Sequence, residues 1–172
     1  MCCQVAAVAS HGIKLDVHRH IVFTNQKKKA VDRSVMKRFN ENRDVISKIK
    51  NIRYKPQDID IDVSIGLPII ARENMKISAG NLHGFSETLD RISNSERFIV
   101  AGAGNGRVRL QFRYDAEKSV DVTYIQLVKF FELDFAMSAH RAQSITVDES
   151  LQIHLEEAKS MTFEAFYVAI SR

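Results

Sequence analysis

Hydrogen-bonding side chains are concentrated in one stretch of the chain, between residues 135 and 148. Within nine positions the stretch carries Ser138, His140, Arg141, Gln143, Ser144 and Thr146. Hydroxyl groups beside a cation can bind a phosphate backbone without reading its base sequence. A helix with a polar outer face and a capped turn explains the same residue types, so the stretch alone leaves both interpretations open.

Arg172 is a second candidate for chemistry. The apolar residues Phe163, Phe166, Tyr167 and Ile170 recur at the spacing of one helix face, and at about 100° per residue Arg172 points to the opposite side. A guanidinium held away from its own core offers a planar fork that can reach phosphate oxygens across a cleft. The alternative is a solvated arginine that interacts favourably with the helix dipole.

A strand, a polar turn and a basic helix are predicted near the start of the chain. The apolar run from Ile21 to Phe23 is typical of a buried strand, and Thr24 or Asn25 can cap the helix that follows. The helix is predicted from apolar residues at helical spacing, namely Val31, Val35, Met36 and Phe39. This order is half of a βαβ unit.

The middle of the chain, about residues 58 to 130, is predicted to be rich in short strands. Ile59, Ile61 and Val63 alternate with aspartates, and the segment 66–70 predicts a turn or an edge. Strands at 98–101 and 108–112 flank Asn105-Gly106, a strong hairpin signal. Several short strands with glycine turns indicate a small β-barrel or sheet module.

From residue 124 onward the α/β pattern returns, with a short helix expected over 135–143 and a strand over 151–155. The predicted fold class is therefore α/β: a partial parallel sheet with helices, interrupted by a small β-barrel-like insert. The expected partition is 1–57 for the first part of the α/β domain, 58–130 for the insert and 131–172 for the second part.

The composition is that of a globular protein. Of 172 residues, 45% are hydrophobic and 27% charged, which excludes a disordered chain. The net charge of +4 permits an anionic partner without proving one. Cys2 and Cys3 are adjacent and form neither a disulfide framework nor a zinc site, so a reducing intracellular compartment is expected. No run approaches the ~20 apolar residues of a membrane helix.

Taken together, the two candidate segments resemble motifs V and VI of superfamily 1 helicases, in particular the RecD-like branch that includes the Pif-type enzymes. That family shows a pattern close to T-x-H-K-S-Q-G-x-T-x-D, followed tens of residues later by Y-V-A-x-S-R. In the first pattern the matching residues are His140, Gln143, Thr146 and Asp148, with Ser138 for Thr, Arg141 for Lys and Ala142 for Ser. In the second the matching residues are Tyr167, Val168, Ala169, Ser171 and Arg172.

The resemblance extends upstream, where Thr24-Asn25 after an apolar strand is similar to motif IV. The segment 66–70, followed by Asn74, Gly80 and Gly84, is similar to the entry of the small barrel in this branch. The sequence departs from the family at Ser144, which stands where the family has Gly. If that position needs a positive φ, the geometry of the turn differs here.

The resemblance implies that residues 1–57 and 131–172 form a partial RecA-like parallel sheet with helices, the C-terminal RecA-like domain of an ATP-dependent DNA helicase. It also implies roles for single residues. Arg172 would be the arginine finger that stabilises charge on the γ-phosphate of ATP. His140, Arg141 and Gln143 would couple the DNA track to the ATP cleft. Contacts to the single strand would come from Thr24, Asn25, Ser138 and Thr146. The partner would be single-stranded DNA or a junction of single and double strands, and the insert would clamp or separate the strands. No protein metal ligand is expected.

The half of the motor that would hold ATP and Mg²⁺ is not found in this sequence. No G-x-x-x-x-G-K-[S/T] loop occurs, and Gly102, Gly104 and Gly106 are predicted to form a hairpin turn. The expectation is that a missing N-terminal RecA-like domain holds the nucleotide and that this chain alone is inactive. Two alternatives remain: a non-catalytic nucleic-acid-binding module that uses the cations of residues 27–33, and an inactive helicase remnant.

Overall fold

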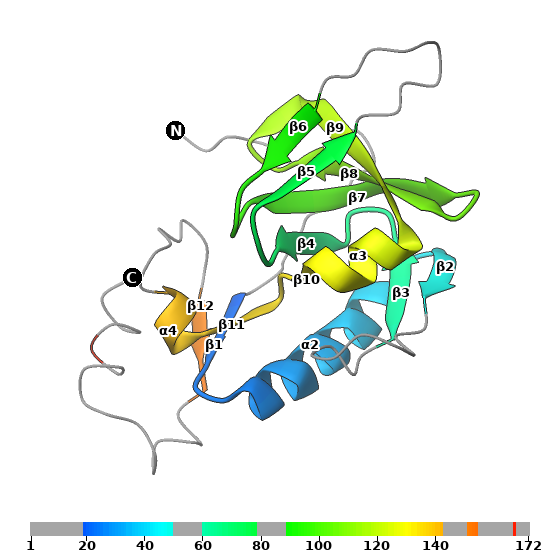
Figure 1. Cartoon of the computed structure of the whole chain (residues 1–172). Coiled ribbons are helices and arrows are strands. Elements are labelled where there is room, and N and C mark those ends of the chain that lie inside the picture. The colour runs from blue at the N-terminus through cyan, green and yellow to red at the C-terminus, as the bar shows by residue number, and fades with distance from the viewer. Residues whose placement is uncertain (1–18, 50–59, 79–88, 143–150, 155–166, 168–172) are drawn as a thin grey trace. The chain divides into compact units, whose positions relative to one another are not determined.

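A computed structural model describes residues 19–49, 60–78, 89–142, 151–154 and 167 (Figure 1). These residues divide into two compact units. The parallel unit contains the described residues of 15–38 and 134–172, and the antiparallel unit contains the described residues of 39–133. Within the described ranges, no helix combines the length and the apolarity that crossing a membrane requires.

The parallel unit is built on a sheet whose central strand is β1 (Arg19–Val22). Its neighbours are β11 (Ala136–Ser138) and β12 (Leu151–Ile153), and both run parallel to β1. The helices are α2 (Asn25–Asn40), which directly follows β1, and α4 (Ala139–Ala142), which follows β11. The predicted α/β class with a parallel sheet is confirmed, as are the strands near residues 21 and 151 and the basic helix after residue 24.

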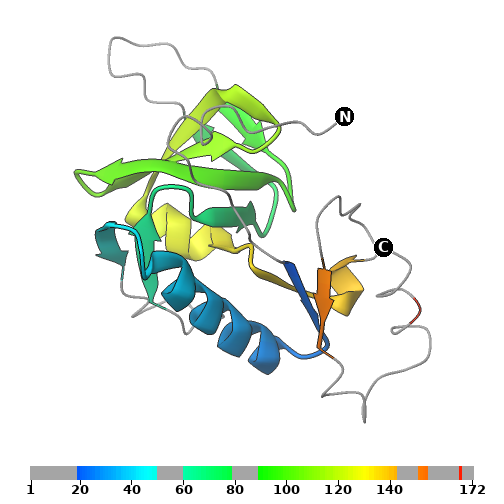
Figure 2. The same cartoon turned by 180° about the vertical axis from the view of Figure 1, so that it is seen from behind.

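Both faces of the parallel sheet carry apolar side chains, because successive residues of a strand point to opposite sides. Val22 and Ala136 pack with Val31 of α2 on one face. Ile21 and Met137 pack with α4 on the other. A parallel sheet is stable when both faces are covered in this way. Figure 2 shows the same elements from behind.

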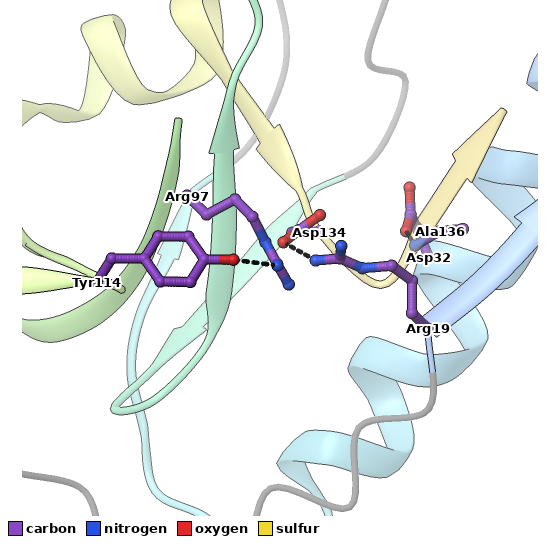
Figure 3. A network of polar contacts seen from close by, with 6 residues as sticks. All are labelled: Arg19, Asp32, Arg97, Tyr114, Asp134 and Ala136. Atoms are coloured by element: carbon purple, nitrogen blue, oxygen red, sulfur yellow. Dashed lines mark hydrogen bonds and ion pairs between the residues drawn. The ribbon is translucent and has the colours of Figure 1, made fainter. Parts of the chain in front are cut away.

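A buried carboxylate fastens α2 to the sheet. One oxygen of Asp32 accepts a hydrogen bond from the backbone N–H of Ala136 at 2.9 Å (Figure 3). The other accepts from Lys28 Nζ at 2.9 Å. Asp32 is 2% exposed as a residue and Ala136 is 3% exposed, so the backbone donor that the carboxylate satisfies has no access to water as a substitute. A second buried ion pair joins Arg19 and Asp134 in the same unit.

The antiparallel unit contains an open five-stranded sheet in the order β10-β4-β7-β8-β9 and two separate two-stranded ribbons, β2-β3 and β5-β6. Its core includes Phe98, Leu110, Leu127 and Phe131, all fully buried. A capping box formed by Thr123 and Gln126 starts α3 (Tyr124–Phe130). The strands are β2 (Val45–Ile49), β3 (Ile61–Ser64), β4 (Pro68–Ala71), β5 (Met75–Ser78), β6 (Leu89–Ile92), β7 (Arg97–Gly104), β8 (Arg107–Phe112), β9 (Asp115–Thr123) and β10 (Phe131–Leu133).

The predicted hairpin at Asn105-Gly106 is confirmed. Both residues have positive φ, 51° and 74°, as the two-residue turn that matches the twist of paired strands requires. Gly104 and Arg107 pair directly on either side of the turn. Gly66 also has a positive φ of 83°, which confirms the predicted turn before β4.

Two predictions need correction. A closed barrel is not formed by the described strands, because β10 and β9 remain as separate edges of the five-stranded sheet. In the described part of the helix expected over 135–143, only Ala139–Ala142 is helical, and residues 136–138 form β11 because pairing with β1 outweighs their local helix preference.

Asp32→Ala is expected to lower the free energy of unfolding by about 1–3 kcal/mol, since it leaves the buried N–H of Ala136 without an acceptor. Asp32→Asn keeps a carbonyl oxygen for that N–H and should cost less. Urea unfolding of the two variants and the parent chain measures the difference. Equal losses in both variants would show that the contact to Ala136 contributes little.

Candidate nucleic-acid interface

The candidate residues gather at one edge of the parallel sheet. Because β1 and β11 are parallel neighbours, their carboxyl ends meet, and Val22 stands opposite Ser138. The chain leaving β1 carries Thr24 and Asn25, and the chain leaving β11 carries His140 and Arg141. The carboxyl ends of parallel strands are where open α/β sheets bind ligands.

Each of these two strands ends near a hydroxyl side chain that caps the next helix. Thr24 Oγ1 accepts a hydrogen bond from the backbone N–H of Lys27 at 3.2 Å, and the carbonyl of Thr24 accepts from the N–H of Lys28 at 3.0 Å. Ser138 Oγ accepts from the N–H of Arg141 at 3.3 Å. Capping holds both residues in place, and a hydroxyl that accepts in this way can also donate its own proton to a phosphate oxygen.

Polar side chains at this edge are open to solvent. Asn25 and His140 are exposed, whereas Thr24, Ser138 and Arg141 are half-buried. Of the two predicted caps for α2, the cap is Thr24, and Asn25 is the first residue of the helix. The edge therefore combines a cation, hydroxyls and an amide, a set that suits contact with a sugar–phosphate backbone.

Sequence reasoning missed a histidine pair at the same sheet. His154 follows β12, its backbone N–H donates to the carbonyl of Ile21 at 2.9 Å, and its Nε2 lies 3.0 Å from Nδ1 of His20. In a hydrogen bond between them one ring nitrogen donates and the other accepts, so the contact links residues at neighbouring strands. The alternation around residue 153 predicted the strand, but only the parallel register shows that its histidine meets a residue 134 positions earlier.

Three predicted site residues, Gln143, Thr146 and Arg172, lie outside the described residues. So does the predicted helix over 163–170, except for Tyr167, which is helical with 60% of its side chain exposed. That exposure is greater than the predicted packed face implies. Within the described ranges, no three His, Cys, Asp or Glu side chains gather in a way that could hold a metal ion.

No protein-family model matches the chain, and no curated protein matches its sequence. Solved structures of Pif1 helicases do share its fold. The Pif1 helicase from Bacteroides in complex with ADP-AlF3 and single-stranded DNA has a TM-score of 0.57 at 15% identity, over 94% of this chain and 39% of that one. Pif1 from Candida albicans has a TM-score of 0.55 at 12% identity, over 93% of this chain and 44% of that one.

A third structure, of two coordinating Pif1 helicases that unwind forked double-stranded DNA, has a TM-score of 0.56 at 17% identity over 92% of this chain. The class defined by the fold is thus an α/β protein with an inserted antiparallel sheet. The particular fold is that of part of a Pif1 helicase, and the predicted resemblance is confirmed at that level. The chain spans about two fifths of the length of these neighbours, from 37% to 44%.

Thr24→Val is expected to lower the free energy of unfolding by about 1 kcal/mol, because it removes the cap from a helix of 16 residues. Thr24→Ser keeps the acceptor and should stay close to the parent. Denaturant unfolding of the whole chain compares the three. A valine variant as stable as the serine variant would remove the capping role.

Proposed function

We propose that this chain is the second RecA-like part of a Pif1-type, ATP-dependent DNA helicase and supplies part of the single-strand track together with the arginine finger. The observation that carries the proposal is the parallel register that pairs Val22 with Ser138, because it places the segment with Thr24 and the segment with Ser138 at the carboxyl ends of two adjacent strands. Segments 114 positions apart in the sequence, each chosen for its likeness to a helicase motif, come together at one edge of one sheet.

In the proposed track, Thr24, Asn25, Ser138 and Thr146 contact the phosphates of a single strand. The hydroxyls of Thr24 and Ser138 are fixed by capping, so they would bind without first losing much side-chain freedom. Support also comes from a structure with the same fold, the Bacteroides Pif1 helicase, which was solved with single-stranded DNA.

In the proposed ATP cleft, Arg172 acts as the arginine finger, while His140, Arg141 and Gln143 couple nucleotide state to the track. An N-terminal RecA-like domain, outside this sequence, would hold most of the ATP and its Mg²⁺. A lone guanidinium cannot neutralise the β- and γ-phosphates, so hydrolysis would need both domains. The match of Tyr167 to Arg172 with the family's second pattern supports this role, as does the ADP-AlF3 bound in the Bacteroides neighbour.

A non-catalytic nucleic-acid-binding module is the second candidate, and the basic helix α2 favours it. Lys27 and Lys29 lie in its first half, Arg33 lies just past its midpoint, and Arg33 is exposed. Both candidates require single-strand binding, and only the helicase requires Arg172 for turnover.

In the whole motor, with this chain joined to a phosphate-loop domain, Arg172→Ala is expected to lower kcat for ATP hydrolysis by about 10³- to 10⁵-fold. Affinity for single-stranded DNA should be largely unchanged. Arg172→Lys keeps the charge without the planar fork and should recover little activity. Steady-state ATPase assays with excess oligonucleotide measure the effect, and normal turnover in the alanine variant would exclude the finger role.

The coupling role proposed for Arg141 requires its side chain to contact the strand as well as the ATP cleft. Arg141→Ala in the isolated chain should therefore weaken binding to oligothymidylate and reduce the slope of log affinity against log salt by about 0.7, the contribution of one phosphate contact on a single strand. Fluorescence anisotropy at several salt concentrations measures both values. Arg91→Ala is the matched control, because Arg91 is an exposed arginine on β6 in the other unit. Equal slopes for the two variants would contradict a track at Arg141.

A further inference from the structure

Two glycines in β7 are not required by the fold of the described residues. Gly102 and Gly104 lack the positive φ found at Gly66 and Gly106, and a Cβ added at either one would meet no atom within 4 Å. Neither backbone conformation nor packing in the described part of the chain therefore requires glycine there. Glycine weakens a strand, and such a position often marks close approach by a ligand or another backbone.

Arginines stand directly beside these glycines. Gly104 pairs with Arg107 and Gly102 pairs with Arg109, so all four residues lie on the same face of the β7–β8 hairpin. The two arginines are two residues apart on one strand, which places them roughly 7 Å apart. We call these four residues the glycine–arginine face.

The two guanidinium groups differ in their surroundings. Arg109 Nε lies 2.9 Å from Asp121 Oδ1, and Nη2 lies 3.2 Å from Oδ2. This hydrogen-bonded pair raises the pKa of Arg109 and holds its fork in one orientation. Arg107 is exposed and makes no ion pair within the described ranges, so its fork is open to an anion.

Among the described strands, the outer edge of β7 has no pairing partner along the glycines. Pairing with β4 covers Arg97 to Ile99, and the last bonds on that side join Val100 to Gly66 and Leu67. Beyond them a bulge interrupts the pairing with β8, and among the described strands none pairs with residues 101–104 on the outer side. Figure 1 shows the β7–β8 hairpin extending past the rest of its sheet.

We propose that the glycine–arginine face binds the phosphodiester backbone of a single nucleic-acid strand. The missing side chains let the ligand backbone approach the hairpin closely, while the guanidinium of Arg107 pairs with a phosphate oxygen. A peptide strand added to the β7 edge is the competing occupant. The short length of 101–104 and the bulge at its start disfavour it, because bulges and short edges hinder strand addition.

The choice of ligand class rests on the proposed function. The glycine–arginine face and the edge at Thr24 and Ser138 consist of different residues, so the two can be tested apart. Gly104→Val is the sharpest variant, since valine fits open space in a strand and should not lower the melting temperature. It should nevertheless weaken oligothymidylate binding by the whole chain, because its side chain stands where the ligand backbone passes. For Arg107→Ala, the slope of log affinity against log salt should be shallower than the parent's by about 0.7. Between 1 M and 0.1 M salt, the variant should therefore gain about fivefold less affinity than the parent.

Arg91→Ala serves again as the control for loss of an exposed charge. The proposal is overturned if Gly104→Val binds as tightly as the parent, whether or not Arg107→Ala does, since nothing would then pass close to the strand. Losses at residues 104 and 107 with none in Arg141→Ala would leave this face standing and remove the proposed track. A loss of affinity in Arg141→Ala alone would support the proposed track and remove the glycine–arginine face as a binding site.

Discussion

The arrangement of the candidate interface depends on the parallel pairing of β1 with β11 and β12. Antiparallel neighbours would send the segments after Val22 and Ser138 to opposite ends of the sheet, whereas parallel neighbours bring them to one edge. Parallel pairing in turn requires cover on both faces, which α2 and α4 provide. Asp32 links these requirements, because its buried carboxylate accepts from the N–H of Ala136 in β11 and so holds α2 against the strand whose end carries Ser138. The capping hydrogen bonds of Thr24 and Ser138 then fix the two hydroxyl groups at this edge.

Features set by short-range chemistry could be predicted from the sequence. The turn at Asn105-Gly106 follows from the ease with which both residues adopt positive φ, and α2 follows from a cap and apolar residues at helical spacing. The motif comparison selected Thr24 and Ser138, and the register Val22–Ser138 brings their segments together.

Long-range pairing was not predictable in the same way: β11 was mistaken for the start of a helix, and the His20–His154 contact depends on a register that local patterns do not encode. Asp32 was missed because an aspartate among lysines on a helix is ordinarily a solvated side chain.

The antiparallel unit contains two strand glycines that its own structure does not require. Its buried residues explain the sheet, but Gly102 and Gly104 remain unexplained by anything within the described fold. Residues that lower the stability of a strand without relieving a clash or a strained φ point to a need outside the chain itself. Because an exposed arginine lies beside them, we propose that the ligand is an anion. A nucleic-acid strand is such a ligand, and it is the same one that we propose for the sheet edge. The two surfaces would then bind the same polymer by different means: capped hydroxyls at the sheet edge and close backbone approach on the hairpin.

The central claim, that the carboxyl ends of β1 and β11 form one phosphate-binding edge, is tested most directly by amide chemical shifts of the ¹⁵N-labelled chain during titration with oligothymidylate. The account predicts that the amides of residues 24–27 and 138–141 shift together, with one common affinity that weakens as salt is added. Shifts confined to one of the two segments, or none at either while the oligonucleotide binds elsewhere, would contradict it.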